Sequence, residues 1–188
     1  MDFKHMTKFW MFFILFGLAF QACSQPTTTT TNTTNSTPKT AATTEQPIPA
    51  AYASDKEGWL VDLDEAYAIS TKEKKPILVN FTGSDWCGWC KKLDADVFSK
   101  PEFQDWAKKN VVLFEADFPR RKSIPQKNQQ QNFALQNAMG VTGYPTIWVL
   151  NLGKDPNSGQ YQINQLGRAG YMPSVTDFIA TIDKFVHP

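Results

Sequence analysis

The chain has 188 residues, of which 41% are hydrophobic, which is enough for one folded domain with an ordinary core plus additional segments. Its 19 Lys and Arg residues nearly balance its 18 Asp and Glu residues and leave a formal net charge of +1. This balance excludes proteins built around a strongly basic surface, so we expect no nucleic-acid partner, and the charge gives no sign of a membrane-binding face.

The N-terminal segment has the pattern of an export signal. Lys4 and Lys8 flank the start of an apolar run at residues 9–20. Such a run is too short to span a bilayer as a helix and has the flanks of a signal peptide. We therefore predict a signal peptide over residues 1–22 and a protein that leaves the cytosol.

A cysteine follows this signal directly. Ala22-Cys23-Ser24 resembles the lipobox of bacterial lipoproteins, in which the cysteine is acylated and becomes the new N-terminus. The resemblance implies lipidation at Cys23 and a lipid-anchored protein on the periplasmic side of a bacterial membrane. Phe20 and Gln21 differ from the residues usual at their positions. The alternative is an ordinary cleaved signal peptide, which predicts a soluble periplasmic or secreted protein.

The segment after the signal differs in composition from the rest of the chain. It is rich in Thr and Pro and has no hydrophobic period, so it buries too little apolar surface to offset chain entropy. We predict a disordered tether over residues 23–55 and a folded domain over residues 56–188.

The folded domain begins with a helix and a strand. Residues 60–69 place apolar side chains among charged ones, the pattern of an amphipathic helix that ends before Pro76. Residues 77–81, Ile-Leu-Val-Asn-Phe, have the β-branching and hydrophobicity of a strand buried on both faces. Such a strand delivers the residues that follow it to its carboxyl end.

Those residues contain a Cys-x-x-Cys pair, Cys87 and Cys90. Leu93 and Val97 continue at helical spacing, so we expect Cys87 to open a helix and the two sulfurs to lie close enough for a disulfide. The free N–H groups of a first helical turn favour a thiolate at Cys87. We predict Cys87 as the nucleophile of thiol–disulfide exchange and Cys90 as the residue that resolves the mixed disulfide.

Two other interpretations of the cysteine pair remain open. A zinc site would need two more ligands, and the remaining candidates are Cys23, His5 and His187, of which the first two lie in the leader. A purely structural disulfide would close a loop too short to constrain the unfolded chain much. We expect no metal, and no cofactor other than a redox-active Cys87–Cys90 disulfide.

Helices and strands alternate through the rest of the chain. A capping box of Ser99 and Glu102, with proline in the first turn, predicts a helix through residue 107. Apolar runs and turn residues then predict strand 111–117, helix 128–139, strand 147–150, a hairpin turn within 151–159, a returning strand from 161 and a helix after Pro173. This order is typical of an α/β fold whose mixed sheet has a parallel portion, an antiparallel C-terminal hairpin and helices on both faces.

A basic loop, Arg120-Arg121-Lys122, follows the strand at residues 111–117. A short charged run of this kind is most simply a solvated connection. The functional alternative is a docking patch for an acidic partner. Both interpretations stay open.

Several stretches together resemble a thioredoxin. They are residues 76–81 (Pro-Ile-Leu-Val-Asn-Phe), 85–91 (Asp-Trp-Cys-Gly-Trp-Cys-Lys) and 140–146 (Gly-Val-Thr-Gly-Tyr-Pro-Thr), with Gly167 before the last helix. The resemblance covers about residues 58–186 and implies the thioredoxin fold. Residues 91–94 and 98–103 are most similar to the exported reductase branch of that family.

The same resemblance implies where a substrate binds. In thioredoxins the proline corresponding to Pro145 is cis and faces the cysteine pair, so we expect a cis Tyr144–Pro145 bond. The backbone of residues 142–144 is then expected to hold an extended substrate chain beside Cys87. The predicted substrate-contacting residues are Trp86, Gly88, Trp89, Thr142, Gly143, Tyr144 and Pro145. Trp86 also suits a packing role that shields the motif.

Two residues depart from the thioredoxin pattern. Asn80 stands at the position of the family's buried acid and cannot take the proton of Cys90, so that step must use water or another carboxylate such as Asp85. Trp89 replaces the proline usual between the cysteines of cytosolic thioredoxins, at a position that helps to set the redox potential.

These features predict a monomeric thiol–disulfide oxidoreductase that reduces or isomerises the disulfides of exported proteins. In an oxidising compartment this activity needs an electron donor, which the sequence does not identify. The first alternative is an oxidase that introduces disulfides, and the second is a non-catalytic thioredoxin-like binding module. A third is a metal chaperone that uses the cysteine pair.

Overall fold

The computed structural model describes residues 52–188. The predictions for residues 1–51, namely the signal peptide, lipidation at Cys23 and most of the tether, lie outside the described residues. Among the residues described, no helix is long and apolar enough to cross a membrane.

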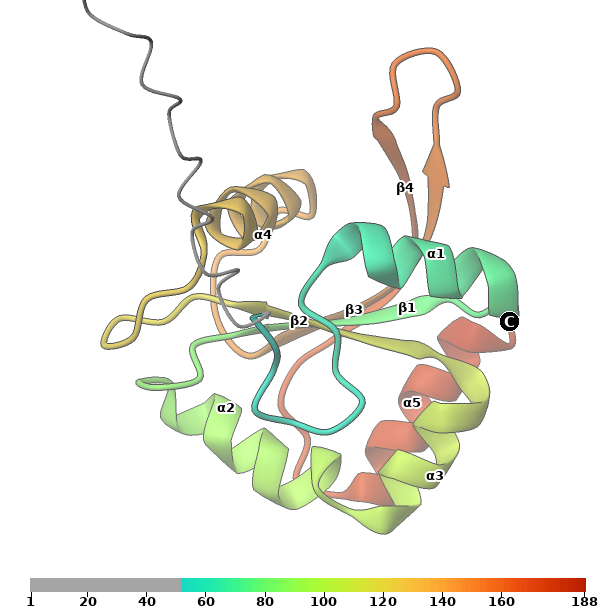
Figure 1. Cartoon of the computed structure of the whole chain (residues 1–188). Helices are drawn as coiled ribbons and strands as arrows, with labels where there is room; N and C mark the ends of the chain where they lie inside the picture. The colour runs from blue at the N-terminus through green and yellow to red at the C-terminus, as the bar shows by residue number, and fades with distance from the viewer. Residues whose placement is uncertain (1–51) are drawn as a thin grey trace, which may run out of the picture. The chain divides into compact units, whose positions relative to one another are not determined.

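A four-stranded mixed sheet forms the centre of the domain, in the order β2-β1-β3-β4 (Figure 1). The strand β1 (Ile77–Thr82) is buried along its whole length, as its apolar sequence predicts. β2 (Val112–Asp117) pairs with it in parallel, and β3 (Thr146–Lys154) pairs with its other edge antiparallel. β4 (Tyr161–Ala169) completes the sheet as the antiparallel partner of β3.

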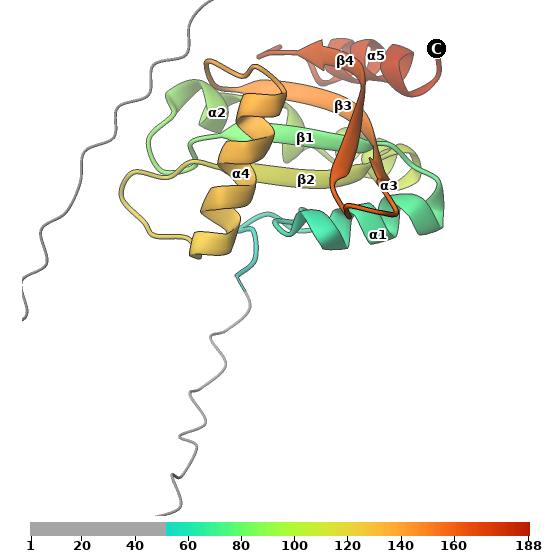
Figure 2. The ribbon, with the colours of Figure 1, turned by 90° about the horizontal axis from the view of Figure 1, so that it is seen from above.

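Two helices cover one face of the sheet. Ile77, Val79 and Phe81 point to this face, because alternate residues of a strand share a side. They pack in one core with residues of α1 (Leu63–Glu73) and α4 (Gln126–Ala138). Seen from above, α4 crosses the strands, whereas α1 runs along them (Figure 2).

Three helices cover the opposite face. Leu78 points to this side and packs in a second core with residues of α2 (Gly88–Leu93), α3 (Pro101–Asn110) and α5 (Val175–Val186). A mixed sheet with helices on both faces confirms the predicted fold class. It also places the cysteine pair at the carboxyl end of the buried strand β1.

The capping box predicted from Ser99 is wrong. α2 continues into a π-helical turn, η1 (Asp94–Phe98), and the N–H of Ser99 still bonds to a carbonyl of that turn. Ser99 therefore keeps helical backbone angles instead of the extended ones that a cap needs, and its hydroxyl donates to the Ala95 carbonyl at 3.1 Å. α3 is preceded by Lys100 and has Pro101 in its first turn, as predicted.

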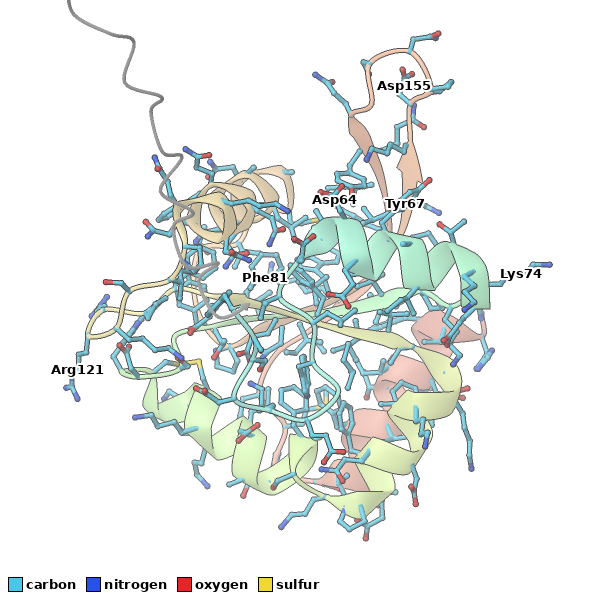
Figure 3. The ribbon with its side chains drawn as sticks, viewed as in Figure 1. Asp64, Tyr67, Lys74, Phe81, Arg121 and Asp155 are labelled. Atoms are coloured by element: carbon cyan, nitrogen blue, oxygen red, sulfur yellow. A yellow bond between two sulfur atoms is a disulfide. The ribbon has the colours of Figure 1, made fainter. Side chains whose placement is uncertain are left out.

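Other boundaries differ from the predicted ones as well. α4 begins two residues earlier than expected, and β3 runs to Lys154 instead of ending at residue 150. The second half of β3 pairs with β4 alone, and this hairpin projects from the sheet with Asp155 in its turn (Figure 3). Lys154 forms an ion pair with Asp64 of α1 at 3.3 Å, so contacts with the helix support the longer strands.

Candidate active site

The cysteine pair lies where the chain turns from β1 into α2. Cys87 immediately precedes the helix, and a disulfide joins it to Cys90. The backbone N–H of Cys90 donates a hydrogen bond to the Cys87 sulfur at 3.2 Å. Cys87 and Cys90 are each only 6% exposed, so the disulfide is largely buried. Within residues 52–188, no group of three or more His, Cys, Asp or Glu side chains could hold a metal ion.

Trp86 closes one side of this turn. Its indole N–H donates to the Phe118 carbonyl at 2.8 Å, and its ring lies edge-on to Tyr144 with ring centroids 5.9 Å apart. Gly83 lies against the same ring, because a Cβ at this glycine would be 2.4 Å from it. Sequence reasoning did not single out Gly83, although it is the residue that makes room for Trp86.

The basic loop is tied to the cysteine motif by Asp85. The Asp85 carboxylate accepts hydrogen bonds from the backbone N–H groups of Arg120 at 3.0 Å, Arg121 at 2.5 Å and Lys122 at 3.1 Å. Desolvation acts to raise the pKa of Asp85, but these hydrogen bonds outweigh it, so the pKa lies below its ordinary value. A carboxylate engaged in this way is poorly placed to take the proton of Cys90.

A cavity of about 160 Å³ beside Cys90 contains other ionisable groups. Lys56, Asp94 and Glu115 line it together with Cys90. Glu115, on β2, is 4% exposed; its carboxylate pairs with the Lys56 ammonium and accepts a hydrogen bond from the Ser54 hydroxyl at 3.2 Å. Burial lowers the pKa of Lys56, and the nearby Asp94 charge opposes that shift. The cavity therefore places a largely buried ion pair beside Cys90.

Sequence reasoning missed this ion pair. Asn80 lies opposite Glu115 in the parallel register, and its side-chain oxygen accepts no hydrogen bond within the described residues. Lys56 comes from the segment before α1, far from Glu115 in the chain. The available signal was an acid inside the apolar run of β2, since an acid buried in a strand normally has a partner.

The loop before β3 packs against Trp86. Its Tyr144–Pro145 peptide bond is cis, and the Tyr144 hydroxyl accepts a hydrogen bond from the Gln136 amide at 2.8 Å. Thr142 and Gly143 are exposed, which leaves their backbone open to a bound chain. The contact between Trp86 and Tyr144 thus brings this loop beside the cysteine motif.

A second aromatic surface lies in the first turn of α2. Gly88 is exposed, and Trp89 is 59% exposed with its ring centroid 5.1 Å from that of Tyr171. The Lys92 ammonium lies 5.7 Å from the Tyr171 ring centre. Tyr171 was not among the predicted site residues, and no local motif marks it, because it reaches α2 from the segment before α5.

Comparison with known proteins agrees with this architecture. A disulfide bond reductase of Chlamydia pneumoniae, DsbH, is 34% identical over 110 residues, which are 58% of this chain and 60% of the relative. The thioredoxin-related protein DsbJ of the same organism is 32% identical over 98 residues, 52% of this chain and 28% of the relative. The matched region therefore spans less than two thirds of the length of either relative.

A solved structure described as a DsbH oxidoreductase superimposes with a TM-score of 0.57 at 28% identity, covering 75% of this chain and 89% of that one. Residues 63–184 match the model of the thioredoxin-like domain family, and this range is more than half of the chain. The predicted resemblance is confirmed: the chain belongs to the thioredoxin-like domain family.

Proposed function

We propose that this chain is a thiol–disulfide oxidoreductase that reduces or isomerises the disulfides of exported proteins. The observation that carries the proposal is the Cys87–Cys90 disulfide at the start of α2, with the Cys90 N–H directed at the Cys87 sulfur. Similarity to a protein named as a disulfide bond reductase supports the reducing direction. Exposed Trp89 and the loop at residues 142–145 offer a surface for a substrate chain.

The reaction begins with the dithiol form. The Cys87 thiolate attacks one sulfur of a substrate disulfide, so that a Cys87–substrate disulfide forms and the first substrate thiolate leaves. Cys90 then loses its proton and attacks the Cys87 sulfur, which closes the Cys87–Cys90 disulfide and releases the second substrate thiolate. Two electrons have passed to the substrate, so a separate thiol donor must restore the dithiol.

The position of Cys87 at the start of α2 supports its proposed role as the attacking residue. The Cys90 N–H and the positive end of the helix stabilise a negatively charged sulfur at Cys87 more than a neutral one. Cys90 lies one turn inside the helix and lines the cavity that contains Glu115.

We propose that Glu115 is the general base that accepts the proton of Cys90. Its carboxylate lines the same cavity as Cys90, and a volume of about 160 Å³ is large enough for water molecules that pass a proton between them. The same carboxylate pairs with the Lys56 ammonium.

The proposal includes action outside the cytosol. The signal pattern at residues 1–22 supports export, and the Ala22-Cys23-Ser24 pattern supports a lipid anchor, with a soluble exported protein as the alternative. The partners are then disulfide-bonded exported proteins and an electron donor that acts in the same compartment.

The equilibrium reduction potential of the Cys87–Cys90 pair tests the direction of electron flow. The full chain in detergent micelles is equilibrated with glutathione or dithiothreitol buffers and followed by tryptophan fluorescence. We expect a value near the reducing end of the family, about −270 mV, whereas a value near −120 mV would make the protein an oxidase. If dithiothreitol reduced the disulfide only when the domain unfolds, both the reductase and the oxidase would be excluded. The non-catalytic binding module would then be the remaining interpretation.

Catalysis itself is tested by insulin reduction with dithiothreitol. Cys87→Ser is expected to abolish the activity. Without dithiothreitol, Cys90→Ser should retain the first attack on insulin and accumulate the mixed disulfide, because the resolving thiol is missing. Insulin reduction that persists unchanged in Cys87→Ser would refute the assignment of the nucleophile.

A further inference from the structure

A second, larger cavity lies beside the cysteine motif. It has a volume of about 470 Å³, and Trp86 and Tyr144 line it. Phe118 and Phe133 contribute further aromatic walls, and Arg120 lies at the same cavity. Trp86 directly precedes Cys87, so the cavity has a wall next to the residue that a substrate disulfide must reach.

The aromatic walls are fixed by one another. Phe118 stacks on Tyr144 with ring centroids 5.2 Å apart, and Phe133 meets Phe118 edge-on at 5.4 Å. Phe133 is nevertheless 54% exposed on α4, an unusual position for a large apolar side chain. The cavity therefore has aromatic walls beside polar side chains, and Phe133 leaves part of the aromatic surface open to a partner.

Arg120 adds a positive charge to this surface. Its guanidinium carbon lies 3.6 Å from the centre of the Trp86 ring, and its backbone is held by Asp85. Lys122 differs, because it pairs with Asp117 at 3.4 Å and with Asp55 at 3.2 Å. Within residues 52–188, no acidic side chain lies within ion-pair distance of the Arg120 guanidinium, so its charge is available to an incoming carboxylate.

We propose that this cavity is the substrate-selecting site of the enzyme. It takes one large apolar side chain of an extended substrate polypeptide, and Arg120 pairs with an Asp or Glu carboxylate close to the substrate cysteine. The inference rests on the proposed function and names its substrate class, which is disulfides flanked by apolar and acidic residues. It assigns a binding role to the basic loop and explains why that loop is anchored to the cysteine motif.

The test uses three disulfide-bonded peptides that share a Phe near the cysteine and differ at one neighbouring position, which is Glu, Gln or Lys. The rate constant for reduction of each peptide is measured with the full chain in micelles, after its dithiol has been formed. We expect the Glu peptide to react up to about fivefold faster than the Gln peptide at low salt, and the Lys peptide to react more slowly. High salt should remove these differences.

Substitutions in this chain test which residues cause the preference among the three peptides. Arg120→Gln should make the rates with the Glu, Gln and Lys peptides equal, and Arg120→Glu should invert the preference in favour of the Lys peptide. Arg121→Gln is the matched control, because it removes the same charge from a side chain that points away from the molecule (Figure 3). Phe133→Ser should slow reduction of the peptides that carry Phe more than reduction of peptides with Ala at that position.

The outcomes separate this inference from the proposed function. If the wild-type protein reduces all three peptides at equal rates, or if Arg120→Gln keeps the preference, the substrate-selecting role is overturned and the oxidoreductase proposal stands. If the wild-type dithiol reduces none of the peptides, the proposed function fails and the inference fails with it.

Discussion

The carboxylate of Asp85 accepts a hydrogen bond from the backbone N–H of Arg120 at 3.0 Å, and so joins the residue two before Cys87 to the loop after β2. The N–H groups of Arg121 and Lys122 bond to the same carboxylate. A carboxylate that accepts several backbone hydrogen bonds is favoured in its charged form. The position of the Arg120 side chain over Trp86 therefore depends on the ionisation of Asp85.

Protonation of Asp85 is expected to loosen this loop. Its folded-state pKa is lowered, so its stabilising effect is present above the unfolded pKa of about 3.9 and is lost as the pH falls through the lower folded value. In NMR spectra, the amide protons of Arg120, Arg121 and Lys122 should titrate together with a midpoint below about 3.9. Asp85→Asn should lack this shared titration. A common midpoint above the ordinary value would contradict the arrangement.

Glu115→Gln is expected to slow the second step of exchange and to leave the first step unchanged. The variant cannot accept the proton of Cys90, so the mixed disulfide should persist about a hundredfold longer, which acid quenching and mass spectrometry can measure. Asp85→Asn is the control, because it neutralises a carboxylate near Cys87 without changing the cavity beside Cys90. If Asp85→Asn prolonged the mixed disulfide and Glu115→Gln did not, the proton would pass through Asp85.

The same substitution tests the ion pair itself. Glu115→Gln removes one carboxylate charge from beside the Lys56 ammonium, whose side chain is 23% exposed. Urea unfolding should show a loss of about 1–3 kcal/mol in the free energy of unfolding. An unchanged free energy of unfolding would mean that the ion pair does not stabilise the fold. The role of Glu115 would then depend only on the measured lifetime of the mixed disulfide.

The sequence predicted those parts of the fold whose signals are local. The apolar run of β1 and the helical spacing after Cys87 each depend on neighbouring residues, and both elements form where they were expected. The pair of Lys56 and Glu115 joins distant segments, and neither segment alone reveals a partner. The contact of Asp85 with the basic loop was missed for the same reason.

The hairpin of β3 and β4 shows a similar limit. Its turn residues were recognised, but its length depends on contacts with α1, such as the ion pair of Lys154 with Asp64. Tyr67 of α1 also meets Tyr161 of β4, with ring centroids 5.5 Å apart. A local pattern of polar and turn residues cannot report contacts of this kind, so β3 was predicted to end too early.

Gly83→Ala is expected to displace Trp86. The added Cβ would lie 2.4 Å from the indole ring, so the ring or the turn must move, at a cost of about 1–3 kcal/mol in the free energy of unfolding. Gly88→Ala is the matched control, since a Cβ at Gly88 meets no atom within 4 Å and alanine is a better helix former than glycine. Urea unfolding and tryptophan fluorescence distinguish the two variants. Equal stabilities would show that the turn adapts to the extra methyl group.

Serine-to-alanine substitutions at Ser99 and Ser174 test whether Ser99 caps α3. The Ser174 hydroxyl caps α5 by accepting the Asp177 N–H at 3.2 Å, so Ser174→Ala should cost about 1 kcal/mol in the free energy of unfolding. Ser99→Ala should change stability by less than about 0.5 kcal/mol, because its exposed hydroxyl only donates to the Ala95 carbonyl and caps no helix. Urea unfolding of the two variants under identical conditions gives the comparison. A loss for Ser99→Ala as large as that for Ser174→Ala would mean that α3 is capped in solution by Ser99, and that η1 ends before this residue.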